Sequence, residues 1–179
     1  MKILAIRHTS VNVPSGICYG HLDVELSVHF AEEAEAVRQL LPDDVQRYMA
    51  ISSPSFRCTN LASRLGLTFS TDARLMELNF GLWEGESWNN IYETDKGKEW
   101  FQDYEHTICP GGESFNQLIK RVQEVVEYYA RNKTENLLIV AHGGTLRALL
   151  LICGVCQTPS ETFAKEIAYG AVLHLIYPA

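Results

Sequence analysis

Two histidines lie at the ends of short apolar runs, in ILAIRH (3–8) and in LLIVAHGG (137–144). Each run is typical of a buried strand, so His8 and His142 are expected at the carboxyl ends of strands, where open α/β sheets bind their ligands. A neutral imidazole can act as a nucleophile or as a general base near neutral pH. The two histidines therefore indicate a reactive site at one edge of a sheet.

The same strand ends carry groups that bind anions. Arg7 precedes His8, and SSPSFRC (52–58) places Arg57 about one turn into a helix that follows a third strand. Gly143 and Gly144 allow close backbone approach, and free N–H groups at a helix start favour an anion. Each feature alone is also common as a solvated strand end, a capped surface helix or a glycine turn. Their occurrence at three strand ends favours a site for a dianion, most simply a phosphoryl group.

A fourth segment, RLMELNFGLWEG (74–85), adds a carboxylate, Glu77, among apolar residues and glycines. Carboxylates serve as general acids and bases, although an exposed glutamate in a surface turn is the ordinary alternative. Together with RHT (7–9), SSPSFRC and AHGGTLR (141–147), this segment resembles the histidine phosphatase superfamily, with the phosphoglycerate-mutase-like fold. The four blocks extend over nearly the whole chain.

The resemblance implies a role for each of these residues. His8 would be the nucleophile that accepts the phosphoryl group as a phosphohistidine, and Glu77 would protonate the leaving oxygen and then activate water. Positively charged or polar groups would hold the phosphoryl oxygens: Arg7, Arg57 and His142. Weaker candidates for phosphate or substrate contacts are Asn12, Gly20, Gly143 and Trp83, and the spacing from His8 to Asn12 is shorter than is usual in the family. No metal and no cofactor is implied, because the arginines supply the positive charge.

Within the superfamily, CYGHLDVEL (18–26) and the RCxxLA pattern of residues 57–62 are most similar to α-ribazole phosphatases. Those enzymes remove the 5′-phosphate of α-ribazole 5′-phosphate in assembly of the cobalamin nucleotide loop. Three alternatives stay open: a broad-specificity or sugar-phosphate phosphatase, a phosphoglycerate mutase, and a non-catalytic phosphate-binding module. The joint presence of a nucleophile and a proton donor favours an enzyme.

The pattern of elements predicts an α/β fold, a three-layer α/β/α sandwich with a mostly parallel sheet. Strands are expected near residues 2–6, 48–51, 137–141 and 171–177. Helices are expected from an N-cap at Ser27 to about Leu41, from an N-cap at Ser53 to Gly66, from the Pro110 turn to Tyr129, and over residues 145–152. No linker divides the chain, so residues 1–179 are expected to form a single domain with a lid-like segment at about 83–110.

The lid-like segment is rich in aromatic and acidic residues. Its aromatic residues between positions 83 and 106 are Trp83, Trp88, Tyr92, Trp100, Phe101 and Tyr104. This composition favours a substrate with one phosphate and a flat ring, which stacking can hold, over a phosphoglycerate, which needs additional cations. Alternatively, these aromatic residues pack the segment onto the sheet.

Composition limits the partners. A net charge of −7 and a pI near 5.3 argue against nucleic acid or an anionic membrane surface as a partner. No apolar run reaches the length of about 18 residues that a membrane span requires. A small-molecule phosphate ester is the expected partner, and the oligomeric state is undetermined. Five scattered cysteines favour a cytoplasmic protein over a disulfide framework, and Cys153-Gly-Val-Cys156 is interpreted as core packing.

Overall fold

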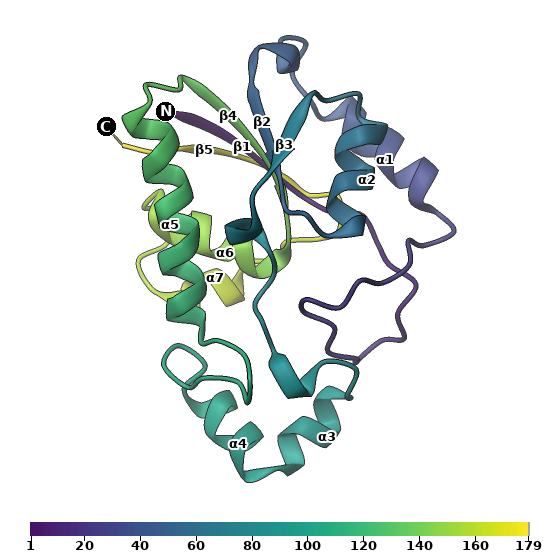
Figure 1. The fold of residues 1–179 in the computed structure, drawn as a ribbon, viewed down its shortest axis with the longest axis vertical. Helices are drawn as coiled ribbons and strands as arrows, with labels where there is room; N and C mark the ends of the chain where they lie inside the picture. Colours follow the sequence, from purple (N-terminus) through teal and green to yellow (C-terminus); the bar gives the residue numbers. More distant parts are fainter. Residues whose placement is uncertain (179) are drawn as a thin grey trace.

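The computed structural model describes residues 1–178, which are built around a five-stranded sheet (Figure 1). The strands are β1 (Lys2–Arg7), β2 (Met49–Ser52), β3 (Phe69–Thr71), β4 (Asn136–Ala141) and β5 (Val172–Ile176), in the spatial order β3-β2-β4-β1-β5. The first four strands are parallel to one another, and β5 pairs antiparallel with β1. The mostly parallel sheet expected from the sequence is confirmed.

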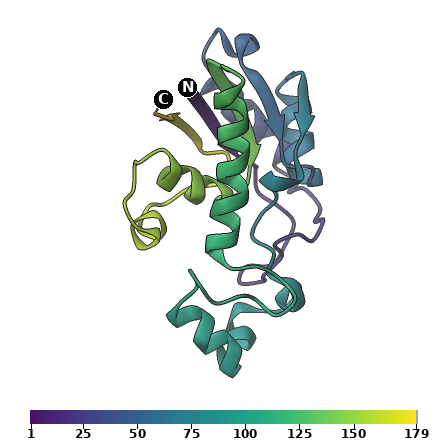
Figure 2. The same cartoon turned by 60° about the vertical axis from the view of Figure 1, so that its left-hand side comes forward.

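Helices cover both faces of the sheet, which makes three layers (Figures 1 and 2). On one face, Leu4 and Ile6 of β1 share a core cluster with residues of α1 (Phe30–Gln39) and α2 (Phe56–Arg64). On the other face, Ile3 and Ala5 share a second cluster with α5 (Phe115–Arg131) and α6 (Gly143–Ile152). Successive side chains of a strand point to opposite faces, so one apolar strand supplies both cores.

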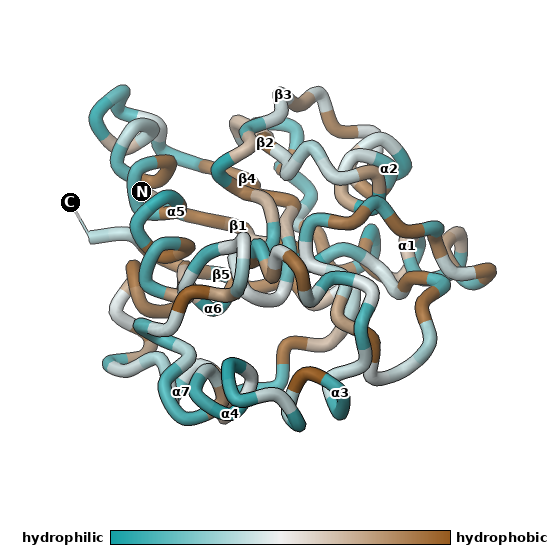
Figure 3. Tube along the Cα trace, turned by 60° about the horizontal axis from the view of Figure 1, so that its bottom comes forward, coloured by the Kyte–Doolittle hydropathy of each residue, from teal (hydrophilic) through white to brown (hydrophobic). Residues whose placement is uncertain are grey.

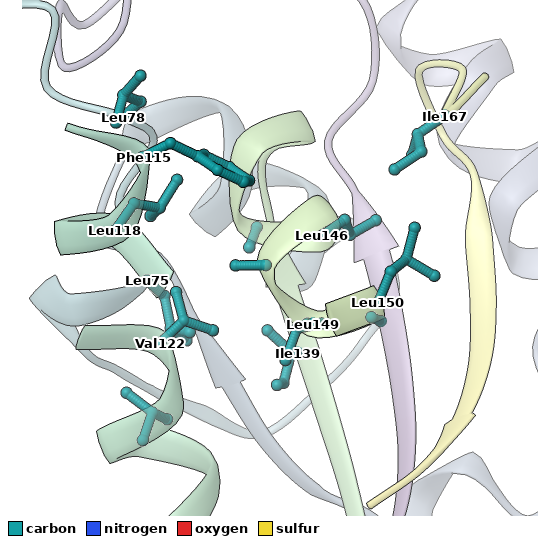
Figure 4. Packing of buried hydrophobic residues seen from close by; sticks show 14 of the residues in the cluster. Leu75, Leu78, Phe115, Leu118, Val122, Ile139, Leu146, Leu149, Leu150 and Ile167 are labelled. Carbon is teal, nitrogen blue, oxygen red and sulfur yellow. The ribbon is translucent and has the colours of Figure 1, made fainter. Parts of the chain in front are cut away.

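The second core binds α5 and α6 to the central strand. Figure 4 shows Leu118 and Val122 of α5 directed toward Leu146 and Leu149 of α6, with Ile139 of β4 beside them. All five side chains are fully buried. The short helix α7 (Pro159–Ala164) packs against α6 and precedes the return to β5. In Figure 3 the central strands are largely brown, whereas teal segments predominate along α4 and α7.

Two helices begin later than the sequence predicts. The first starts at Phe30 with His29 as N-cap, and the second starts at Phe56 with Ser55 as N-cap, so Ser27 and Ser53 are not the caps. The Ser27 hydroxyl instead accepts from the N–H of His29 in the preceding turn. Ser53 continues the chain from β2, and its hydroxyl is hydrogen-bonded to His142. A tertiary partner therefore replaces the local capping role at Ser53.

Residues 83–110, which show no clear period in the sequence, form α3 (Trp88–Glu93) and α4 (Asp95–Gln102). The Ser87 hydroxyl caps α3 by accepting from the N–H of Asn90, and the Thr94 hydroxyl caps α4 by accepting from the N–H of Gly97. The two helices project below the sheet in Figure 1, away from the helices that cover its faces. Three-residue 3₁₀ turns occur at Val45–Arg47, Ala73–Leu75 and Gly81–Trp83.

Two further features bear on the sequence predictions. Cys156 is buried and Cys153 packs against the same core, which confirms the interpretation of this pair as core packing. No helix within residues 1–178 combines the length and the apolar character that crossing a membrane requires.

Candidate active site

The sheet brings His8 and His142 together, because they follow the neighbouring parallel strands β1 and β4. The strand register pairs Arg7 with Ala141, and the backbone N–H of His8 donates to the carbonyl of Ala141 at 3.0 Å. The two imidazole rings meet edge to face with their centroids 5.2 Å apart. Both side chains are almost completely buried.

One nitrogen of His8 is free to react. Its Nδ1 lies 2.7 Å from the carbonyl oxygen of Thr9, which can only accept, so Nδ1 carries the proton and Nε2 has the lone pair. Burial, followed by the positive charge of Arg57, lowers the pKa of His8 from 6.5 to about 3. The imidazole is therefore neutral at physiological pH, which is the state a nucleophile needs.

The surroundings of His142 also keep it neutral. Burial, and then the charge of Arg57, holds the pKa of His142 well below its ordinary value of 6.5. Nε2 of His142 is hydrogen-bonded to the Ser53 hydroxyl at 2.8 Å, and the Cys58 sulfur lies 3.5 Å from the same nitrogen. These contacts fix the ring beside His8.

The buried neutral state of His8 predicts acid-sensitive folding. The pKa of His8 is lower in the native than in the unfolded protein, so below pH 6.5 the unfolded state binds more protons. Stability is then lost as pH falls from about 6.5 toward 3, and His8 alone accounts for about 2 kcal/mol at pH 5. We expect denaturant titrations at pH 7 and pH 5 to show a drop in unfolding free energy that is smaller by this amount in His8→Ala. An equal drop in both proteins would contradict the prediction.

Arg57 is held in the site by backbone carbonyls. Its Nη1 donates to the carbonyl of Leu22 at 2.9 Å and its Nη2 to the carbonyl of Gly20 at 2.7 Å, and the side chain is fully buried. Within residues 1–178, its buried Nε has no hydrogen-bond partner. Buried N–H groups are rarely left unpaired, so this Nε is a donor available to an anion.

Arg7 has a similar arrangement. Its Nη1 donates to the carbonyl of Ile167, and its Nε is likewise buried and unpaired among the described residues. The ring of Tyr169 lies against the guanidinium, with the Arg7 Cζ 4.0 Å from the ring centroid. Two fixed arginines thus each offer one buried donor near His8.

The carboxylate of Glu77 sits at the start of α6. Oε2 accepts from the N–H of Gly144 at 3.1 Å, and Oε1 accepts from the N–H of Leu78 at 2.9 Å. A Cβ on residue 144 would lie 2.2 Å from Oε1 of Glu77, so a side chain at this position would displace the carboxylate from the place it has here. The carboxylate is therefore placed next to Gly143, which itself lies beside Arg7.

Two further side chains hold the segment that carries Glu77. Arg121 donates to the carbonyls of Arg74, Met76 and Glu77 at 2.6–2.8 Å and forms a 2.6 Å ion pair with Glu113. Glu84 accepts backbone N–H bonds from His21 and Leu22, whose loop supplies the carbonyls that hold Arg57, and from Phe80. Arg121 and Glu84 therefore fix the backbone of the segments that carry Glu77 and that hold Arg57.

A cavity of about 200 Å³ adjoins Glu77 and Arg7. Its walls come from the sheet edge, from α4 and the loop after it, and from α5, α6 and α7. They consist of apolar and aromatic side chains, Leu78, Phe80, Trp100, Tyr104, Phe115 and Phe163, and of one further cation, Arg147. The indole N–H of Trp100, a residue that is 8% exposed, has no hydrogen-bond partner within residues 1–178. The cavity can take a ring-shaped group.

The weaker candidates for phosphate or substrate contacts differ in their distance from the site. Gly20 contacts a residue of the site, whereas Asn12 and Trp83 lie elsewhere. The carbonyl of Gly20 accepts from Arg57, and a Cβ there would lie 2.4 Å from Oε1 of Glu84. The Asn12 side chain is exposed and contacts Glu25 at 3.4 Å. Trp83 is buried against Trp100 and is not among the residues that line the cavity.

Sequence reasoning missed several residues around the site, among them Tyr19, Tyr169, Glu84, Arg121 and Arg147. Arg147 lies one turn after Gly143 in the same motif, so helical spacing alone could have found it. The others meet the site through contacts between distant segments. Among residues 1–178, no three histidine, cysteine, aspartate or glutamate side chains gather closely enough to hold a metal ion.

The chain is similar to known proteins over nearly its whole length. The model of the histidine phosphatase superfamily (branch 1) matches residues 3–177. A Hydrogenobacter thermophilus protein, provisionally named phosphoserine phosphatase 2, is 30% identical over 163 residues, which cover 86% of this chain and 79% of that protein. The adenosylcobalamin/α-ribazole phosphatase of Escherichia coli is 28% identical over 170 residues, covering 90% and 82%.

The fold has solved counterparts. The crystal structure of the α-ribazole phosphatase from Shigella flexneri superposes with a TM-score of 0.85 at 24% identity, covering 97% of this chain and 89% of that one. This likeness confirms the phosphoglycerate-mutase-like fold. With the family match over residues 3–177, it follows that the chain belongs to the histidine phosphatase superfamily and is a phosphatase, a hydrolase of phosphate monoesters.

Proposed function

We propose that the chain hydrolyses its phosphate ester through a phosphohistidine on His8. The observation that carries this proposal is the pair of buried, unpaired Nε–H groups of Arg7 and Arg57, two arginines whose charges both act on a neutral His8. A phosphoryl dianion would pair with both donors, and His142 would contact a third oxygen. Nε2 of His8 then attacks phosphorus and the bond to the leaving oxygen breaks. Fixed charges around the phosphoryl group supply most of the rate.

Glu77 acts in both halves of this reaction. In the first half the protonated carboxyl gives its proton to the leaving oxygen. In the second half the carboxylate takes a proton from the water that attacks the phosphohistidine, which returns His8 to its neutral form. The N–H groups of Leu78 and Gly144 hold the carboxylate at the mouth of the cavity, where the leaving oxygen would lie.

For the substrate we propose α-ribazole 5′-phosphate, as in assembly of the cobalamin nucleotide loop. The aromatic cavity beside Glu77 suits a flat base, and the unpaired indole N–H of Trp100 suits an acceptor on the base or the ribose. In this proposal residues 83–110 act as a lid that closes the cavity around the leaving group. The name of the E. coli relative supports the same substrate.

Phosphoserine is the second candidate, and Arg147 is the observation that favours it. This half-buried arginine lines the cavity, and its Nη1 donates to the carbonyls of Thr162 and Lys165. Its other donors could bind the carboxylate of an amino acid. Relatives named as phosphoserine phosphatases occur in H. thermophilus and Arabidopsis thaliana. A sugar phosphate has neither a flat aromatic ring nor a carboxylate and ranks below both.

We expect kcat/KM for α-ribazole 5′-phosphate to exceed that for phosphoserine, sugar phosphates and phosphoglycerates by about 5- to 150-fold, because stacking and one hydrogen bond between neutral groups together contribute ~1–3 kcal/mol. Phosphate release would be measured in EDTA for each ester, with His8→Ala as the inactive control. Faster turnover of phosphoserine would overturn the proposed substrate, α-ribazole 5′-phosphate. The proposed phosphohistidine mechanism would still stand.

Trp100→Phe tests the proposed contact of the indole N–H with the leaving group. The variant keeps an aromatic ring in the wall and removes only the N–H group, so the KM for α-ribazole 5′-phosphate should rise and that for phenyl phosphate, whose leaving group offers no second acceptor, should not. Trp88→Phe is the matched control, because Trp88 stacks on Trp100 at 5.8 Å and does not line the cavity.

The proposed place of action is the cytoplasm. All five cysteines are free, and four of them are buried. Free thiols are usual in proteins of reducing compartments.

A further inference from the structure

We propose that Tyr19 and Tyr169 form a bridge over the phosphoryl site and act as positioning residues for Arg7 and Arg57. The inference rests on the proposed role of these two arginines as phosphate ligands. The tyrosines come from segments 150 residues apart, the loop after β1 and the loop before β5, and their hydroxyls are hydrogen-bonded at 2.9 Å.

Each ring of the bridge lies against one of the two arginines. The Arg7 Cζ is 4.0 Å from the centroid of Tyr169, and the Arg57 Cζ is 5.3 Å from the centroid of Tyr19. Both distances are in the range of cation–π attraction. The Tyr169 ring also lies 5.5 Å from the ring of His8. The bonded hydroxyls therefore join the two guanidinium groups into one unit that spans the nucleophile.

Other contacts anchor the bridge to the site from both ends. The N–H of Gly170 donates to the carbonyl of His8 at 3.1 Å, and Arg7 donates to the carbonyl of Ile167, so the loop that carries Tyr169 is tied to the end of β1. At the other end, the carbonyl of Gly20, the residue after Tyr19, accepts from Arg57. Tyr19 and Tyr169 thus follow any movement of the arginines.

The bridge acts at the phosphate end of the site. Neither tyrosine lines the cavity beside Glu77 in which we place the leaving group. Since the bridge holds the arginines and does not touch the leaving group, it should change the binding of every ester and of a free oxyanion by the same factor. Fixing the two donors before binding lowers the ordering cost of capturing the dianion.

The test is a double-mutant cycle on the two hydroxyls. Tyr19→Phe and Tyr169→Phe keep both rings on their arginines and remove only the hydrogen bond. We expect each single variant to bind orthovanadate, measured as a competitive inhibitor, about fivefold more weakly, which corresponds to about 1 kcal/mol. The double variant should lose no more than either single one, because the hydroxyls act as a unit. The KM values for α-ribazole 5′-phosphate and phenyl phosphate should rise by the same factor, with little change in kcat.

Matched controls distinguish the possible failures. Tyr128→Phe, at an exposed position on α5, should leave vanadate binding unchanged. Arg57→Lys tests the underlying assumption, because it should weaken vanadate binding if Arg57 is a phosphate ligand. If Arg57→Lys has this effect and the tyrosine variants have none, or if their losses add in the double variant, the bridge is overturned and the phosphate site stands. If Arg57→Lys has no effect, the phosphate site itself is overturned, and the bridge with it.

Discussion

Replacement of His8 by alanine is expected to lower kcat by at least ~10⁴-fold, because the variant has no atom to carry the phosphoryl group between the two half-reactions. Nε2 of His8 carries the lone pair that can attack phosphorus, since Nδ1 is hydrogen-bonded to the carbonyl of Thr9. Initial rates of phosphate release would measure the loss. Acid quenching of the wild-type enzyme with radiolabelled substrate should trap an acid-labile phosphoenzyme that the variant does not form.

The control for this variant is His174→Ala. His174 lies on the edge strand β5 with an exposed side chain, so its loss should leave turnover near that of the wild-type enzyme. Thermal unfolding would verify that His8→Ala is folded. A folded His8→Ala that retains more than about a hundredth of the activity, or that still traps a phosphoenzyme, would assign the nucleophile elsewhere.

Replacement of Glu77 by glutamine is expected to lower kcat about 10²–10³-fold for α-ribazole 5′-phosphate, since the amide cannot transfer a proton. Glutamine should occupy the same position as Glu77, because its side-chain oxygen can still accept a hydrogen bond from the N–H of Leu78 or Gly144. The loss of rate in Glu77→Gln should depend on the leaving group. p-Nitrophenolate departs without a proton, so the first half-reaction should stay fast with p-nitrophenyl phosphate, and the second, which needs a base, should become slow.

Stopped-flow kinetics would show this difference directly. With p-nitrophenyl phosphate, Glu77→Gln should give a burst of one nitrophenolate per enzyme followed by slow turnover, whereas an alkyl ester should give no burst. Glu86→Gln, at an exposed position in the same segment, is the matched control and should behave as the wild-type enzyme. Undiminished turnover of an alkyl ester by Glu77→Gln would remove Glu77 from the mechanism.

Much of the fold follows from local patterns. Apolar runs predicted β1, β2, β4 and β5 to within about two residues, and helical spacing predicted α5. These elements are long or strongly periodic, so their own residues determine them. The three-residue strand β3 and the short helices α3, α4 and α7 were not predicted, because elements of this size depend on their neighbours for stability.

The site was partly predictable for the same reason. The carboxyl ends of parallel strands meet at one edge, so His8 and His142 were expected together, and their rings are 5.2 Å apart. The expected N-cap at Ser53 was wrong, because a buried imidazole 89 residues away binds its hydroxyl. At that position a tertiary hydrogen bond outweighs the local preference of serine for capping a helix.

The sequence by itself determined which groups stand at the strand ends, namely an arginine and two histidines, with glycines where the backbone must come close. Only the tertiary structure decided how they are held and what surrounds them. It placed Trp100 in the cavity wall and Trp83 against Trp100, held Arg57 by the carbonyls of Gly20 and Leu22, and joined Tyr19 to Tyr169. Periodicity records which face of an element is buried, and it contains no information about which distant loops will meet.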